Sequence, residues 1–262
     1  MNQDIRIFRE PVVYLVGRQV LAQEEIDRFL ADHDVSTWTT DTEIAGEHLM
    51  ETAGRVCYMS FAKPRPGGNA AYIQHLLEVG HGSVLEHAVW NFIFAGISRS
   101  LTHELVRHRA GFGYSQLSQR YVDESVAEYV EPDVIAEDPE LHRYWLEIIA
   151  RTHDAYVHLA EKLQDKYQEE ADRTMRRKLA RQAARSVLPN ATETKIFVTA
   201  NARALRHFIE MRGSKHAEVE IRKLAVQVLR IMQVEAPHVF GDYKIIPLSD
   251  GTHEAITPHR KV

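Results

Sequence analysis

The sequence predicts an α+β fold, with a small mixed or antiparallel sheet and a helical bundle. Two stretches rich in β-branched and aromatic residues pass directly into stretches with helical spacing of apolar residues, at residues 87–107 and 194–212. Residues 140–188 contain no proline and no glycine, which favours long helices. No internal repeat or low-complexity linker divides the chain, so we expect one domain over residues 1–262.

The first third of the chain alternates between strand and helix signals. Strands are indicated by β-branched and aromatic residues, helices by apolar residues three or four apart, and loops by proline and glycine. The expected order is a strand over 11–20, a helix over 24–30, a helix over 42–60 that stops near Ala62, Lys63 and Pro64, a loop over 64–68, and a helix over 69–79 that ends at Gly80.

Residues 87–95 form the clearest strand pattern, because Ala88, Trp90, Phe92 and Phe94 alternate with the other face. A helix is expected to follow at once. Its apolar stripe is Ile97, Leu101 and Leu105, and its polar stripe is Arg99, His103 and Arg107.

The rest of the chain reads as helices with one further strand. We expect long helices over 140–188 with a break near 168–172, a strand over 194–200, and helices over 201–212 and 216–234. The tail, residues 246–262, shows little patterning and is expected to be poorly ordered.

Composition narrows the class of protein. The formal charge of -5 and the pI near 6.3 argue against a general nucleic-acid binder, which should carry a basic excess. Cys57 is the only cysteine, so the chain suits a reducing compartment. The N-terminus lacks the apolar core of a signal peptide, and no run is apolar enough to span a membrane. We therefore expect a soluble cytoplasmic protein that binds neither nucleic acid nor membrane.

The run RHRAGFGYSQLSQRY, from Arg107 to Tyr121, is the most informative stretch. It places Arg107, His108 and Arg109 in a row and returns a serine and another arginine after a short loop of glycine and aromatic residues. Arginine presents a fixed fork of donors suited to phosphate, and glycine lets backbone N–H groups approach a ligand. A solvated helix end remains an alternative, but the convergence of cations predicts a site for a phosphorylated, planar molecule.

Other chemistries fit less well. In the segment from His103 to His108, five residues at about 100° each place the two imidazoles roughly 140° apart on a helix, so no metal site is expected there. Gly111-Phe112-Gly113 lies outside any dinucleotide-binding fingerprint. Cys57 is interpreted as core packing rather than as a nucleophile, because cysteine is among the most often buried residue types.

Two further sets of basic residues occur near the second strand-to-helix passage. One is a stripe that recurs every four residues, Arg173, Arg177, Arg181 and Arg185. The other is Asn201, Arg203, His207 and Arg212. For the first set a solvated helix face is the better explanation, except that Arg185 lies at the helix end that leads toward the second strand and is a candidate site residue. For the second set a solvated face explains the spacing as well as a binding site does.

Several segments in this order resemble the flavin-dependent thymidylate synthases, from about residue 50 to 237. They are GRVCYMS, HGSVLEHAVWNFIFAGISRSLTHELVRHR, SQLSQRYV, ARSVLP, TKIFVTANARALRHFIEMR and HAEVEIRKLA. The resemblance implies that family's mixed fold, a homotetramer with active sites at subunit interfaces, and tightly bound FAD. It also implies methylation of dUMP to dTMP, with 5,10-methylenetetrahydrofolate as carbon donor and NADPH as reductant.

The resemblance also implies roles for individual residues. For FAD it indicates Ser83, Glu86, His87, Arg107, His108, Arg109, Asn201, Arg203 and His207. For dUMP it indicates Arg99, Gln116, Ser118, Gln119, Arg120, Arg185 and Arg212. Arg212 is implied to polarise the uracil ring, and with Ser118 and His87 it makes up the implied catalytic residues.

Two departures from the family pattern bear on these roles. The spacer between Arg109 and Ser118 is one residue longer than usual, and Glu218 stands where glutamine is common. A relative that methylates another uridine nucleotide such as UMP is therefore an alternative. An alternative of a different class is a non-catalytic nucleotide- or nucleic-acid-binding protein, suggested by the arginine stripe.

Overall fold

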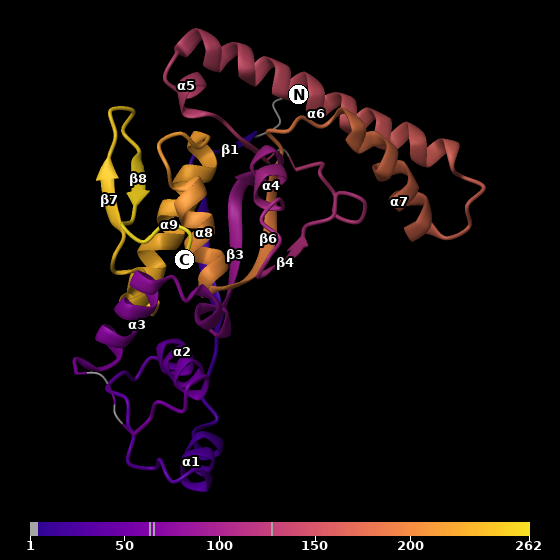
Figure 1. Ribbon diagram of the computed structural model, residues 1–262. Helices are drawn as coiled ribbons and strands as arrows, with labels where there is room; N and C mark the ends of the chain where they lie inside the picture. The colour runs from indigo at the N-terminus through magenta and orange to yellow at the C-terminus, as the bar shows by residue number, and fades with distance from the viewer. Residues whose placement is uncertain (1–4, 63, 65, 127) are drawn as a thin grey trace. The chain divides into compact units, whose positions relative to one another are not determined.

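Alternation of buried aromatic residues builds the strand β3 (Val89–Ser98), in which Trp90, Phe92 and Phe94 are buried. In the computed structural model, which describes residues 5–62, 64, 66–126 and 128–262, β3 belongs to a 4-stranded sheet of order β2-β3-β6-β4. Its other strands are β2 (Val12–Arg18), β4 (Phe112–Gln116) and β6 (Glu193–Asn201). The expected mixed architecture of helices and sheet is confirmed (Figure 1).

The chain divides into two compact units. Unit 1 comprises Met1–Val12, Phe94–Val106 and Ser115–Ile196, and unit 2 comprises Val13–Ile93, Arg107–Tyr114 and Phe197–Val262. The division passes through all four strands of this sheet, so each of them has residues in both units. The expectation of a single domain stays a prediction.

Unit 1 is dominated by a pair of helices. Asp138 caps α6 (Pro139–Lys166) and Asp172 caps α7 (Arg173–Ala184), each accepting backbone N–H bonds at the helix start. The two helices pack against each other (Figure 1), and residues 167–172 form the expected break. The other elements of unit 1 are β1 (Arg6–Phe8), α4 (Arg99–Leu105), β5 (Glu128–Val130), α5 (Asp133–Ala136) and the 3-10 turn η2 (Arg185–Val187).

Unit 2 has its core around α9 (Val219–Glu235), which buries apolar residues on most of its faces and contacts α8 (Ala202–Arg212). Glu218, the residue that departs from the family pattern, caps α9 by accepting hydrogen bonds from the N–H groups of Glu220 and Ile221. The other elements are α1 (Gln23–Asp32), α2 (Ala45–Val56), α3 (Gly68–Val79), the 3-10 helix η1 (Gly82–His87), α10 (Pro237–Phe240), β7 (Lys244–Pro247) and β8 (His253–Ile256).

Most of the expected elements are confirmed, including the helix that ends at Gly80, whose φ of 72° closes α3. Three expectations are wrong. The tail forms the antiparallel pair β7 and β8, and Ala255 within it is buried. The stretch after Gly111 is the strand β4 rather than a loop. The helix after β3 ends at Leu105, so Arg107 does not continue the stripe of Arg99 and His103.

Two elements have other bounds than the sequence predicts. Lys63, where the second helix was expected to stop, lies outside the described residues, and α2 ends earlier, at Val56. His87 belongs to η1 rather than to the strand that follows. In the described part of the chain, no helix combines the length and the apolar character needed to cross a membrane.

Candidate active site

His108 is the centre of a cluster in unit 2. Its imidazole, partly buried, lies edge-on to Phe208 with ring centroids 5.4 Å apart, and its ring centroid is 5.8 Å from that of His207. Arg212 donates its Nε–H to His108 Nε2 at 3.0 Å. Burial, and then the charges of Arg212 and His207, lower the pKa of His108 to about 4. The ring is therefore neutral at pH 7 and can accept the Arg212 bond.

The strand β4 fixes the backbone of this cluster. The Tyr114 hydroxyl donates to the carbonyl of His108 at 2.7 Å, and the Tyr114 ring stacks on Phe112 with centroids 5.6 Å apart. Tyr114 lies six residues further along the chain, in β4, so the strand fixes the position of the His108 backbone.

Gly111 brings the chain against the start of α8. Its φ is +73°, and a Cβ atom there would lie 2.7 Å from Asn201 Nδ2 and 2.8 Å from Ala204 Cβ. The N–H of Asn201 donates to the Gly111 carbonyl, and the Asn201 side chain caps α8 by accepting from Ala204 N at 2.8 Å. Only glycine fits both the conformation and the space. Gly111 thus forms a tight turn that precedes β4, within the spacer between Arg109 and Ser118.

A cavity of about 460 Å³ lies at this end of α8, and we call it the α8 cavity. Arg203 donates to Glu86 Oε1 at 2.6 Å on its wall, and a Cβ atom on Gly82 would lie 2.8 Å from Arg203 Nε. The cavity brings together four of the residues predicted to bind FAD. Its lining includes Glu86, Asn201, Arg203 and His207, together with Ala110, Gly111, Ala204, Lys261 and Val262.

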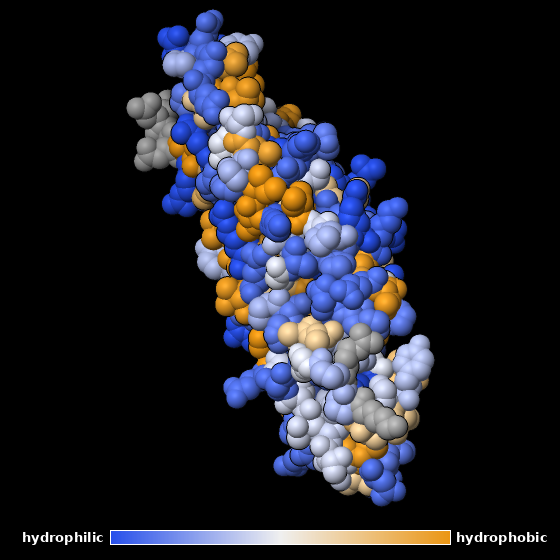
Figure 2. Space-filling model, turned by 60° about the vertical axis from the view of Figure 1, so that its left-hand side comes forward, coloured by the Kyte–Doolittle hydropathy of each residue, from blue (hydrophilic) through white to orange (hydrophobic). Residues whose placement is uncertain are grey.

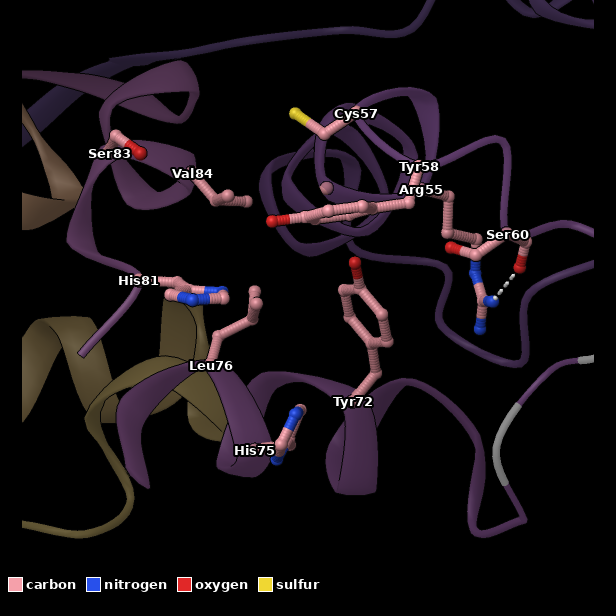
Figure 3. Close-up of a pocket in the computed structure, with 11 residues that line it drawn as sticks. Arg55, Cys57, Tyr58, Ser60, Tyr72, His75, Leu76, His81, Ser83 and Val84 are labelled. Atoms are coloured by element: carbon pink, nitrogen blue, oxygen red, sulfur yellow. Dashed lines mark hydrogen bonds between the residues drawn. The ribbon is translucent and has the colours of Figure 1, made fainter. Parts of the chain in front are cut away.

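A second cavity in unit 2, of about 390 Å³, is rich in aromatic and titratable groups. We call it the tyrosine cavity, since Figure 3 shows Tyr58, Tyr72 and His81 pointing into one space. Arg55 underlies it: Glu51 accepts two bonds from the buried guanidinium, which lies 4.8 Å from the centroid of Tyr72. Such faces and donors suit a planar heterocycle.

The sequence interpretation missed most of the tyrosine cavity. Of its lining only Ser83 was predicted as a site residue, although Cys57 and Tyr58 fall within the segment GRVCYMS. Cys57 is exposed, so its interpretation as core packing is wrong. Its position after the end of α2 leaves it outside the buried face of that helix. The full lining is Gly54, Arg55, Cys57, Tyr58, Ser60, Tyr72, His75, Leu76, His81, Ser83 and Val84.

Unit 1 carries the other donor set. Ser98 caps α4, and Arg99 follows it directly as a half-buried side chain. Burial lowers the pKa of Arg99; Glu124 opposes the shift and Arg185 adds to it, which indicates that the two guanidinium groups lie close together. At the end of β4, Gln116 donates to Thr102 Oγ1 at 3.1 Å.

The residues after β4 include buried donors without partners. Gln119 is 5% exposed, and neither its Nε2 nor Arg120 Nε finds an acceptor among the residues that the structure describes. Buried donors are nearly always paired in folded proteins. These two nitrogens, with the hydroxyl of Ser118 before them, place hydrogen-bond donors together in the segment that follows β4.

Three of the residues predicted to bind FAD lie outside both cavities. Arg107, Arg109 and His87 have exposed side chains and line neither the α8 cavity nor the tyrosine cavity. His108 lies beyond the end of α4, so the helical-phase argument about a metal does not apply to the structure. Within the described residues, no group of three or more His, Cys, Asp or Glu could hold a metal ion.

Known proteins resemble the chain over most of its length. The family model described as thymidylate synthase complementing protein matches residues 40–238. The flavin-dependent thymidylate synthase of Mycolicibacterium gilvum is 52% identical over 242 residues, which is 92% of this chain and 94% of that protein. That of Mycobacterium marinum is 50% identical over 242 residues, with the same coverage of 92% and 94%.

A solved structure shares the fold. The UMP/dUMP methylase PolB from Streptomyces cacaoi, bound with 5-Br dUMP, has a TM-score of 0.64 and 20% sequence identity, and the match covers 90% of this chain and 96% of that one.

Proposed function

Because the chain belongs to the flavin-dependent thymidylate synthase family, we propose that it methylates dUMP to dTMP, with 5,10-methylenetetrahydrofolate as carbon donor and NADPH as reductant. The observation that carries the proposal is the 52% identity across 92% of the chain. The family match over residues 40–238 includes the residues of both donor sets, and the structure supports a separate role for each set.

The donor set of unit 2 fits a flavin dinucleotide. Gly111, where a Cβ atom would not fit, lines the α8 cavity, and Arg203 and His207 offer donors to a diphosphate. We assign the flavin to Ser83, Glu86, His87, Arg107, His108, Arg109, Asn201, Arg203 and His207. The flavin, when bound, supplies the reducing equivalents of the methylation.

The donor set of unit 1 fits the nucleotide. Arg99, Arg120 and Arg185 would hold the phosphate by charge-assisted hydrogen bonds, with Gln116, Ser118 and Gln119 as further donors. The unpartnered nitrogens of Gln119 and Arg120 support this assignment.

Arg212 is assigned to the reaction itself, with Ser118 and His87 as the other catalytic residues. The neutral His108 accepts the Nε–H of Arg212 and so fixes the plane of the guanidinium. A fixed cation beside the pyrimidine would stabilise negative charge that develops on the ring, and such preorganised charge is often the largest contribution a protein makes. This role needs no thiol nucleophile.

We also propose a homotetramer whose active sites are built at subunit interfaces. Large apolar side chains are exposed in unit 2, including Tyr14 at 52%, Val16 at 49% and Phe197 at 40%. Apolar side chains are visible among hydrophilic ones on the surface in Figure 2. Strand β2 is also an edge strand of its sheet. Edge strands and exposed apolar surfaces are commonly covered by another protein chain.

One assay tests the proposal. The purified protein should show the absorption of oxidised flavin and should release dTMP from dUMP when both co-substrates are added. A colourless preparation that forms no dTMP, even after added FAD, would contradict it.

Methylation of UMP is the second candidate, favoured by the longer spacer between Arg109 and Ser118, which contains the Gly111 turn. Turnover of UMP and dUMP measured side by side separates the two, and a preference for UMP would replace the first proposal. The arginine stripe gives less support to a nucleic-acid binder, since Arg181 donates within the chain to Tyr121 O at 2.7 Å and Asp123 Oδ2 at 2.6 Å.

A further inference from the structure

Glu124 is a partly buried carboxylate of unit 1, in the segment that follows Arg120. Its Oε1 atom is buried and has no hydrogen-bond partner in the part of the chain that the structure describes. It interacts electrostatically with Arg99. Arg99 in turn interacts with the positive charge of Arg185, which lowers the pKa of Arg99. The sequence gives no sign of this role, because Glu124 looks like any acidic residue of a polar loop.

Helix α6 holds the backbone on both sides of this carboxylate. The N–H of Glu124 points to the hydroxyl of Tyr156 at 3.4 Å, and His153 Nε2 lies 3.1 Å from the carbonyl of Ser125. His153 and Tyr156 are both buried, and the other imidazole nitrogen of His153 contacts the Tyr129 hydroxyl at 3.0 Å. The position of Glu124 is therefore set by the helix and not left to a flexible loop.

Helix α7 holds the residues just before it. The two bonds that Arg181 donates to Tyr121 O and Asp123 Oδ2 fix the chain between Arg120 and Glu124. The predicted phosphate donors and the buried carboxylate thus lie on one anchored segment.

The other charged groups around Glu124 are already balanced. Glu193 and Glu128 raise its pKa, but Lys195 donates to both of them, at 2.7 and 3.3 Å. Glu193 also accepts from Gly96 N, and Glu128 from Arg6. The remaining neighbours are the hydroxyls of Tyr129 and Tyr156, whose pKa values are raised by burial and which stay neutral. The charge of Glu124, by contrast, acts on Arg99, whose pKa it raises.

Burial raises the pKa of Glu124 to about 7, against the opposing effect of Arg99. Near neutral pH the protonated and ionised forms therefore both occur in the free protein.

We propose that Glu124 is the internal counter-ion of the Arg99 and Arg185 pair, and that it takes up a proton from solvent when a nucleotide phosphate binds there. The inference rests on the proposed dUMP site. A phosphate dianion brings two negative charges to the pair, and the buried carboxylate then faces net repulsion, which favours its protonated form. The protonated carboxyl also gains a donor that can reach a phosphate oxygen or a neighbouring carbonyl.

The pH dependence of dUMP binding tests this inference. The phosphate stays a dianion above pH 7, since its second pKa is about 6. The dissociation constant of the wild type should rise with pH between 7 and 9, by up to about tenfold per unit. Glu124→Gln should keep its dissociation constant within about a factor of two over that range. Glu161→Gln, which alters an exposed carboxylate on α6, should follow the wild type.

Calorimetry tests the same inference on the wild-type protein alone, so the result does not depend on whether a variant folds. Titration of dUMP at pH 8 in two buffers of different ionisation enthalpy should show the uptake of close to one proton. Zero uptake, or a Glu124→Gln protein with the wild-type pH slope, would overturn the inference.

Arg185→Ala separates this failure from failure of the proposed site. If Arg185→Ala loses dUMP affinity while Glu124→Gln keeps the wild-type slope, only the role of Glu124 is wrong. If Arg185→Ala binds dUMP like the wild type, the phosphate site is wrong, and the inference about Glu124 is wrong with it.

Discussion

At the scale of single residues, His108 shows how burial selects the protonation state that a hydrogen bond requires. A protonated imidazole has no acceptor, so it could not take the Nε–H of Arg212. Burial lowers the pKa of His108 to about 4 and keeps the acceptor available at neutral pH. The arginine is thereby held in a fixed orientation by a neutral ring, which suits a role in stabilising negative charge.

Replacing Arg212 with alanine should lower kcat for dTMP formation by roughly 100-fold or more, with a smaller change in the KM for dUMP, because preorganised charge acts mainly in the transition state. Steady-state kinetics with dUMP varied will measure both constants. Arg203→Ala serves as the comparison, since it removes a cation of the same helix that is assigned to the flavin. An Arg212→Ala enzyme with normal kcat would contradict the assignment.

Replacing Arg185 or Arg120 with alanine should chiefly raise the KM for dUMP, by roughly 10-fold to 100-fold, because a hydrogen bond between charged groups contributes about 1.5–3 kcal/mol. The same kinetic assay gives the result. Arg173→Ala, at the exposed start of α7, should leave the KM unchanged. Normal KM values in both test variants would place the phosphate elsewhere.

The lowered pKa of His108 also predicts how stability changes with pH. The folded protein favours the neutral ring, so this contribution is complete above pH 6.5, the ordinary value, and is lost as the pH falls toward 4. The difference in Tm between the wild type and His108→Gln should therefore be largest near pH 7 and shrink toward pH 4. Differential scanning fluorimetry across that range measures it, and a constant difference would exclude the linkage.

At the scale of elements, sequence periodicity predicts helices and strands that carry a strong local pattern. It misses strands that form only because a distant strand pairs with them. The helices α6, α7 and α9 and the strands β3 and β6 carry strong patterns and are confirmed. Strands β1 and β5 span three residues each and exist because they pair with each other, across most of the first half of the chain. Strand β4 was missed because glycine and polar residues dominate it, and its partner β6 stabilises it.

At the candidate site, too, some features are predictable from the sequence and others only from the structure. Motif segments predict the residues of the two donor sets, and the structure gathers Glu86, Asn201, Arg203 and His207 around one cavity. Sequence reasoning could not find the tyrosine cavity or Glu124, because burial and an unpartnered oxygen are properties of the folded chain. The exposure of Cys57 was misjudged for a related reason, since residue-type averages say nothing about where a helix ends.

Gly111 and Gly113 offer a matched test of the turn before β4. Gly111→Ala should destabilise the protein by about 1–3 kcal/mol, because it requires a left-handed conformation and a close contact. At Gly113 the nearest atom to a new Cβ is Thr199 Cβ at 3.7 Å, an ordinary contact, so Gly113→Ala should change stability little. Denaturant unfolding compares the two, and equal stability of both variants would refute this account.

At the scale of the whole molecule, the two compact units each carry one donor set. The set assigned to the flavin, with Arg212, belongs to unit 2, and the set assigned to the phosphate belongs to unit 1. A function that needs both sets is consistent with the proposed assembly of active sites from several subunits. No periodicity or spacing in the sequence reports such an assembly, which is why it rests on the resemblance and on exposed apolar residues.

Light scattering coupled to size-exclusion chromatography tests the assembly. The wild type should have the mass of a tetramer, and Val16→Asp should shift it to a smaller species, because a charge in an apolar interface is strongly unfavourable. Val134→Asp, at another exposed valine, in unit 1, is the control. A monomeric wild type would contradict the proposed tetramer.

The turn at Gly111 has a consequence for how such chains diverge. Because the turn lies between the Arg-His-Arg segment and β4, and Tyr114 within the strand holds the carbonyl of His108, a residue can be gained ahead of the strand while its alternation is kept. In evolutionary terms this turn is a joint at which the chain can change length, provided that Gly111 is kept. Variation in nucleotide preference among relatives is best sought at this joint, by exchanging its residues between chains of different spacer length.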